Sequence, residues 1–150
     1  MKNLLLPLVM LGTTLAGAAC SADSPIPDSA KTSANGLQYA FEILPESNGN
    51  YLLRLKAGNP GSETVTLEFP STSQVNFSIK QDDETIFFTG VGGAALTYAD
   101  VLPGEVEYFE YHWHGKRLSG EAVSGVFAIT CTQISSGEKV QLERTLLISH

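Results

Sequence analysis

The sequence contains little charge and only two cysteines. Asp, Glu, Lys and Arg make up 17% of its 150 residues, against about 25% in ordinary soluble domains. Hydrophobic residues account for 43%, which is too many for a disordered chain, and the length suits one domain. Acidic residues outnumber basic ones by sixteen to nine, which gives a formal net charge of −7. Such a chain is not suited to neutralising nucleic-acid phosphates or to binding anionic lipid headgroups.

The sequence also lacks the common catalytic and cofactor-binding motifs. It has no G-x-S-x-G and no C-x-x-C. The stretch Gly90–Ala95 fits the dinucleotide fingerprint G-x-G-x-x-A, but that fingerprint requires a following helix, and a strand-like stretch leads on to Pro103 instead. His112 and His114 would share one face of a strand, yet no third metal ligand accompanies them. We therefore expect no catalytic residue, no metal site and no cofactor.

The N-terminus is typical of an export signal. Lys2 precedes an uncharged run from Leu4 to Ala19, and these sixteen residues fall short of the roughly 20 that span a bilayer. Small residues end the run, as they do before a signal-peptide cleavage site. Residues 1–19 are therefore predicted to be a signal peptide.

Two routes of cleavage fit this signal. The stretch Leu15–Cys20 resembles a bacterial lipobox, in which the cysteine becomes the lipidated first residue, whereas Ala16-Gly17-Ala18 fits the A-x-A rule of ordinary cleavage.

The position of Cys20 also allows a disulfide with Cys131, but Cys131 lies inside an apolar strand-like run. We favour lipidation of Cys20, which predicts a membrane-anchored lipoprotein of the cell envelope. Ordinary cleavage would give a soluble periplasmic or secreted protein.

The rest of the chain divides into a linker and one domain. Residues 20–35 are rich in Ser, Ala, Pro and Asp and predict a flexible linker. From residue 36 to residue 150, short runs rich in Val, Ile, Thr and aromatic residues alternate with turn residues, and no helical repeat is sustained. The runs are 37–44, 51–55, 64–69, 75–80, 85–89, 96–102, 106–113, 126–134 and 140–148. This pattern predicts an all-β, antiparallel, immunoglobulin-like β-sandwich of about eight or nine strands.

Two details follow from the same pattern. Glu105 and Glu107 are polar on the face that later carries Phe109 and Trp113, so we expect a β-bulge near Tyr108 that moves the apolar face across. Trp113 is expected to anchor the core.

The stretch from Val65 to Trp113 resembles the bacterial intracellular proteinase inhibitor family (BsuPI type). The likeness rests on Val65–Ser71 (VTLEFPS), on Phe77–Lys80 (FSIK), and on Leu102–Glu105 (LPGE) followed by Trp113. It covers about 50 of the 150 residues well and the flanking strands loosely. The resemblance implies an all-β domain that inhibits a serine protease.

Two loops suit such a role by their position. Lys116 and Arg117 offer a basic pair for an acidic specificity pocket. Gly90, Gly92 and Gly93 would let the backbone approach a protease cleft closely. We therefore expect a non-enzymatic, protein-binding sandwich whose partner is a serine protease or another envelope protein, with the membrane reached only through the lipid at Cys20. The alternative is an envelope interaction module without inhibitory activity.

Overall fold

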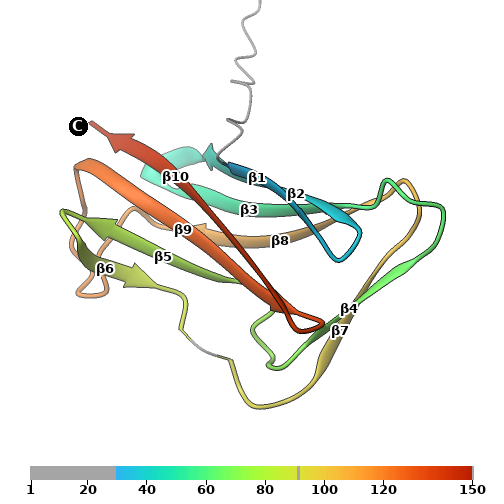
Figure 1. Cartoon of the computed structure of the whole chain (residues 1–150). Helices are drawn as coiled ribbons and strands as arrows, with labels where there is room; N and C mark the ends of the chain where they lie inside the picture. Colours follow the sequence, from blue (N-terminus) through green and yellow to red (C-terminus); the bar gives the residue numbers. More distant parts are fainter. Residues whose placement is uncertain (1–29, 91, 150) are drawn as a thin grey trace, which may run out of the picture.

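The computed structural model describes residues 30–90 and 92–149, and within them the chain is built almost entirely from β-strands (Figure 1). A short 3-10 turn at Ser47–Gly49 (η2) joins β2 to β3. The strands in this part of the chain are β1 (Lys31–Ala34), β2 (Leu37–Pro45), β3 (Tyr51–Gly58), β4 (Val65–Phe69), β5 (Asn76–Gln81), β6 (Glu84–Phe88), β7 (Thr97–Val101), β8 (Val106–Trp113), β9 (Gly125–Ser135) and β10 (Glu138–Ile148).

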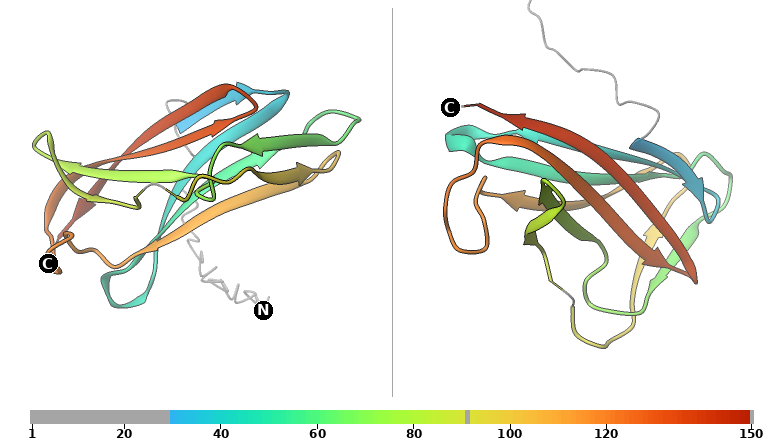
Figure 2. Two further views of the ribbon diagram at one scale, coloured as in Figure 1. Left: turned by 90° about the horizontal axis from the view of Figure 1, so that it is seen from below. Right: turned by 60° about the vertical axis from the view of Figure 1, so that its left-hand side comes forward.

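The strands form two four-stranded antiparallel sheets and one two-stranded pair. The first sheet has the order β1-β2-β3-β8 and the second the order β10-β9-β5-β6, and the two lie as separate layers in Figures 1 and 2. The third pair, β4 and β7, contacts β9 and β8. The prediction of an antiparallel, immunoglobulin-like β-sandwich is confirmed, and the described residues form ten strands in place of the expected eight or nine.

The core between the layers follows from the alternation of apolar residues along each strand. Phe41 and Leu55 from the first sheet and Phe77 and Ile129 from the second are all buried. Trp113 is buried as predicted, and its ring lies 5.8, 6.3 and 6.2 Å from the rings of Tyr51, Phe87 and Phe127, measured between centroids.

The predicted linker ends earlier than residue 35. Residues 31–34 form β1, which pairs antiparallel with the first half of β2. The two strands are joined by Asn35 and Gly36, whose φ angles of 53° and 75° are the left-handed values of a two-residue hairpin turn. The domain therefore includes residues 30–35, and the sequence signal for this was the Asn-Gly pair. The predicted signal peptide and the linker up to residue 29 lie outside the described residues.

The predicted bulge near Tyr108 is wrong. β8 pairs with β3 residue by residue, from Tyr51 opposite Trp113 to Gly58 opposite Val106. Glu107 follows the regular alternation of β8 and is only partly buried. It lies opposite the small side chain of Ala57. No change of face is needed to accommodate it.

Candidate functional site

The loop between β8 and β9, residues 114–124, is closed on itself by backbone hydrogen bonds. Its two arms meet in a β-bridge between Lys116 and Ala122. Backbone N–H groups donate from Arg117 to Glu121 at 2.9 Å, from Gly120 to Arg117 at 2.9 Å and from Val123 to Gly115 at 3.1 Å. Its backbone is therefore fixed without any contribution from its exposed side chains.

Among the bonds that attach this loop to the body of the domain, two reach buried residues. The indole Nε1 of Trp113 donates to the carbonyl oxygen of Lys116 at 2.9 Å, and the N–H of Leu118 donates to the carbonyl oxygen of Ile86 at 3.0 Å. Because Trp113 and Ile86 are buried, the loop rests on the core and on the edge of β6.

The structure separates the two basic residues predicted to act as a pair. The Arg117 guanidinium donates to Gln81 Oε1 at 3.1 Å and lies 3.7 Å from a carboxylate oxygen of Glu84. The side chain of Lys116 is exposed. Leu118, which the sequence analysis did not single out, is 60% exposed. The exposed side chains of this loop therefore include Lys116 and Leu118, together with Ser119 and Glu121.

The glycine-rich segment after β6, unlike the β8–β9 loop, is held by close packing against another segment of the chain. A Cβ built on Gly92 would lie 2.3 Å from the backbone nitrogen of Ser73, so only glycine fits there. Gly93 accepts a bond from the Thr72 N–H at 3.0 Å and donates its own N–H to Thr72 Oγ1 at 2.8 Å. Gly90 has a φ of 79°, in the left-handed region that favours glycine. Gly92 and Gly93 thus dock this segment onto residues 72–73, and the polar backbone groups of Gly93 are occupied. β7 follows where the dinucleotide fingerprint would require a helix.

His112, in β8, and His114, directly after the end of that strand, are both exposed. Nδ1 of His112 lies 3.0 Å from the Glu46 carboxylate, and Nδ1 of His114 lies 3.2 Å from Asn50 Oδ1. Within residues 30–90 and 92–149, no group of three or more His, Cys, Asp or Glu side chains could hold a metal ion.

Of the two cysteines, only Cys131 lies in the part of the chain that the structure describes. Cys131 is completely buried in β9, as a small core residue, and burial raises the pKa of its thiol. Cys20, the predicted lipidation site, lies outside the described residues. In the part of the chain that the structure covers, no helix is long and apolar enough to cross a membrane.

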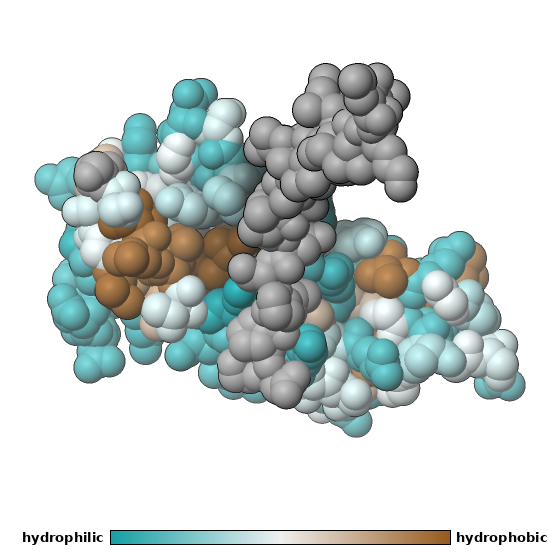
Figure 3. All heavy atoms as spheres, turned by 90° about the horizontal axis from the view of Figure 1, so that it is seen from above, coloured by the Kyte–Doolittle hydropathy of each residue, from teal (hydrophilic) through white to brown (hydrophobic). Residues whose placement is uncertain are grey.

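Apolar side chains are exposed where β9 begins and β10 ends. Val126 and Leu147 lie directly opposite each other in the β9–β10 ladder and are both well exposed. Seen from above, apolar side chains also gather over the end of β10 (Figure 3).

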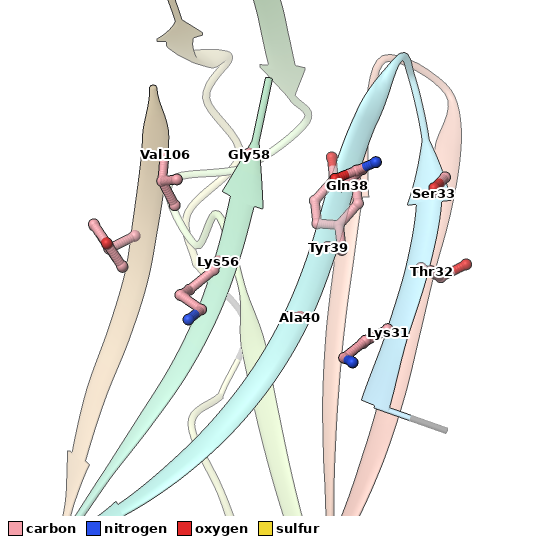
Figure 4. A pocket seen from close by; sticks show the side chains of 10 residues that line it. Lys31, Thr32, Ser33, Gln38, Tyr39, Ala40, Lys56, Gly58 and Val106 are labelled. Carbon is pink, nitrogen blue, oxygen red and sulfur yellow. The ribbon is translucent and has the colours of Figure 1, made fainter. Parts of the chain in front are cut away.

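A groove of about 640 Å³ crosses the outer face of the first sheet. Two neighbouring cross-strand rows carry most of its lining. The first row runs Tyr108, Lys56, Ala40 and Lys31, and the second Val106, Gly58, Gln38 and Ser33, each in the order β8, β3, β2 and β1. Thr32 and Tyr39 complete the lining. The two central strands contribute the small residues Gly58 and Ala40, so the sheet is hollowed between the side chains of its outer strands. Figure 4 shows Lys56 and Lys31 on either side of Ala40.

An ion-pair network fixes two side chains of this groove. Lys56 Nζ lies 2.5 Å from Glu42 Oε1, and Arg54 lies between Glu42 at 3.9 Å and Glu110 at 2.6 Å. The Arg54 guanidinium lies over the ring of Tyr108, 5.1 Å from its centroid. Both the ammonium of Lys56 and the ring of Tyr108 are therefore held in place from the adjacent row. No motif in the sequence marked this groove, because its residues come together only through strand pairing.

Comparison with known proteins gives no family. No protein family model matches the chain, and no curated protein does. Among solved structures, DesR, a β-glucosidase from Streptomyces venezuelae in complex with D-glucose, is 12% identical, with a TM-score of 0.40 over 73% of this chain and 14% of that chain. β-Glucosidase 3B from Thermotoga neapolitana is 16% identical, with a TM-score of 0.38 over 77% of this chain and 17% of that chain. The GAE domain of GGA2p from Saccharomyces cerevisiae is 13% identical, with a TM-score of 0.23 over 81% of this chain and 98% of that chain. The chain thus spans only a small part of either β-glucosidase, and similarity at these TM-scores carries no conclusion about function.

Proposed function

We propose that this protein is a non-enzymatic, protein-binding β-sandwich of the cell envelope that inhibits a serine protease. The observation that carries the proposal is the β8–β9 loop, whose backbone is closed by its own hydrogen bonds and attached to Trp113 and Ile86, while Lys116 and Leu118 point side chains to solvent. A loop fixed before binding loses little conformational entropy when it meets a protease. The resemblance of residues 65–113 to the BsuPI-type inhibitors supports the same role.

The direct test is a titration of the full chain against one subtilisin-like and one trypsin-like protease. An inhibitor gives loss of protease activity that is linear in added protein and complete near one equivalent. A chain that leaves both proteases active and is cut rapidly after Lys116 or Arg117 is a substrate, and that result overturns the proposal.

A second candidate is an envelope interaction module without inhibitory activity. The exposed apolar pair Val126 and Leu147 favours it, since exposed apolar patches often mark protein contacts. The bonds of Arg117 to Gln81 and Glu84 also favour it, because they occupy a basic side chain that an acidic specificity pocket would need. A photo-crosslinker placed at residue 147 in cells distinguishes the two candidates: a recurring partner that is not a protease supports the module.

For its location, we propose that Cys20 carries the lipid that holds the protein at the envelope. The buried acyl chains contribute about 0.8 kcal/mol per CH₂ group, so two or three chains give stable anchoring. Intact mass of the exported protein tests this directly. A polypeptide that begins at Ala19 and carries no lipid would end the lipoprotein proposal, and Cys20→Ser should move the protein to the soluble fraction.

A further inference from the structure

We propose that the free edge of β8 binds an extended segment of a partner protein as an added β-strand, and that this segment alternates basic with apolar residues. β8 ends the sheet order β1-β2-β3-β8, so it has a paired neighbour on one side only. β7, which precedes it in the chain, contacts β8 but pairs with β4. The side chains that carry the proposal lie in the first half of β8, whereas the β8–β9 loop follows its end, and the proposal does not depend on protease inhibition.

The hydrogen-bond register shows which residues of β8 face its free edge. The N–H of Asn59 donates to the carbonyl oxygen of Glu105 at 2.9 Å, one pair before the β3–β8 ladder begins. Bonded and non-bonded pairs alternate along an antiparallel ladder, so residues 107, 109, 111 and 113 bond β3. The backbone groups that point away from the sheet are therefore those of Val106, Tyr108, Glu110 and His112. Within residues 30–90 and 92–149, no protein group bonds these N–H and C=O groups.

The other edges of the two four-stranded sheets are shorter or more covered. β1 and β10 contact each other, and β10 also contacts β2, so the sandwich is closed on that side. β6 has five residues, and its Ile86 carbonyl accepts the N–H of Leu118. β8 offers an open edge of eight residues. Unpaired N–H and C=O groups along such an edge are a template for pairing with another chain.

Space for an added strand lies beside the middle of β8. A groove of about 300 Å³ is lined by residues 108–110 of β8 on one side and by Thr72, Gln74 and Val75 on the other. An added strand lies about 4.8 Å from its neighbour in a sheet, so one of its side chains reaches this groove. In this mode of recognition the backbone bonds supply affinity, and the spaces for alternate side chains supply specificity.

The side chains at the start of β8 indicate the chemistry of the partner. Glu105 and Glu107 are two residues apart and face the same way, and neither forms an ion pair in the described part of the chain. Val106 and Tyr108 face the other way and are 42% and 50% exposed. Opposite charges and apolar contacts across a strand pair are both stabilising. The complementary strand therefore alternates Lys or Arg with apolar residues.

A second copy of this chain suits the edge less well. Its own β8 would bring Glu105, Glu107 and Glu110 and no Lys or Arg, and each copy has a formal net charge of −7. Like charges across a strand pair are destabilising, and charged side chains commonly keep the edge strands of identical chains apart. The carboxylates that oppose pairing between copies attract a basic strand, so the partner is a different protein.

The first test titrates the full chain into a labelled peptide in which lysine alternates with valine and tyrosine, followed by fluorescence anisotropy. We expect binding at least tenfold tighter than for the same peptide with glutamate in place of lysine. Only every second residue of an added strand bonds the edge. Methylation of one alternate set of peptide nitrogens should therefore weaken binding at least tenfold, and methylation of the other set less than twofold. Equal affinity for the two peptides, or equal effects of the two methylations, would overturn the proposal.

Variants of residue 108 test the backbone of β8 itself. Tyr108→Pro removes an N–H from the free edge and none from the ladder with β3, a position where a strand tolerates proline, and it should weaken binding at least tenfold. Tyr108→Ala is the matched control, because it removes the ring and keeps the N–H, and its effect should be clearly smaller. Thermal unfolding checks each variant, and the methylated peptides test the same bonds if Tyr108→Pro does not fold. Equal affinity of the two folded variants would contradict the proposal.

The carboxylates and the choice of partner are tested separately. Glu105→Gln combined with Glu107→Gln should weaken binding of the lysine peptide at least fivefold. Glu68→Gln, which changes an exposed carboxylate on β4, should change it less than twofold, and equal losses would contradict the proposal. Light scattering should find the wild type monomeric. A dimer that Tyr108→Pro dissociates would assign the edge to a second copy and overturn the proposed partner.

Discussion

Two loops of this domain are held firmly, but by opposite means. The β8–β9 loop is fixed through its backbone and through the indole of Trp113, which leaves Lys116 and Leu118 exposed. The segment around Gly92 and Gly93 is fixed because it lacks side chains and can therefore press against residues 72–73. A loop of the first kind presents side chains to a partner, whereas in the second kind the small residues serve the packing of the domain itself.

The largest effect on the first loop should come from removing its anchor. Trp113→Ala deletes a buried ring and the bond to the Lys116 carbonyl, and we expect a loss of about 3–5 kcal/mol in the free energy of unfolding, measured by urea denaturation. Trp113→Phe keeps most of the packing and loses the hydrogen bond, so its loss should be clearly smaller. Equal losses in the two variants would mean that the ring volume does not anchor this region.

In the second loop, the segment around Gly92 and Gly93, steric crowding should lower the free energy of unfolding. Gly92→Ala places a Cβ against the Ser73 backbone, and we expect a loss of about 1–3 kcal/mol in unfolding free energy. Gly93→Ala is the matched control, because its Cβ would meet Thr72 Oγ1 at an ordinary 3.7 Å, and it should change stability by less than about 0.5 kcal/mol. If the two variants unfold at the same urea concentration, the docking of Gly92 is not what holds the segment.

The sequence predicts the strands and the core of this fold well, because alternation along a strand reports directly which face is buried. It fails at β1, whose polar residues 31–34 become a strand only by pairing with β2 through the Asn35-Gly36 turn. It also fails at Glu107, where a small residue opposite makes a change of phase unnecessary. These are properties of neighbouring strands, which the pattern within one strand does not contain.

The candidate sites are harder to predict for the same reason. Lys116 and Arg117 are adjacent in the sequence, yet Arg117 bonds Gln81 and Glu84 on another hairpin. The lining of the groove comes from four strands, and β8 lies beside β3 in the sheet although β4, β5, β6 and β7 separate the two strands in the sequence. No spacing along the chain could bring Tyr108, Lys56 and Lys31 together.

The smallest stability effect should come from the polar contacts of the first loop. Arg117→Ala removes the bond to Gln81 and the ion pair with Glu84, but the two side chains of the pair are 32% and 73% exposed. Solvent screens such a pair, so we expect less than about 1 kcal/mol in unfolding free energy. A loss above 2 kcal/mol would show that side chains, and not the backbone bonds, fix this loop.

The most direct test of the proposed function compares one exposed leucine from each region. Leu118 at the first loop is 60% exposed, and Leu96, shortly after the second, is 61% exposed. Leu118→Asp and Leu96→Asp should both leave the fold intact, and each is titrated beside the wild type against the protease that the wild type inhibits. We predict that Leu118→Asp weakens inhibition at least tenfold while Leu96→Asp inhibits like the wild type. Full inhibition by Leu118→Asp, or an equal loss in both variants, would contradict the claim that the β8–β9 loop is the binding element.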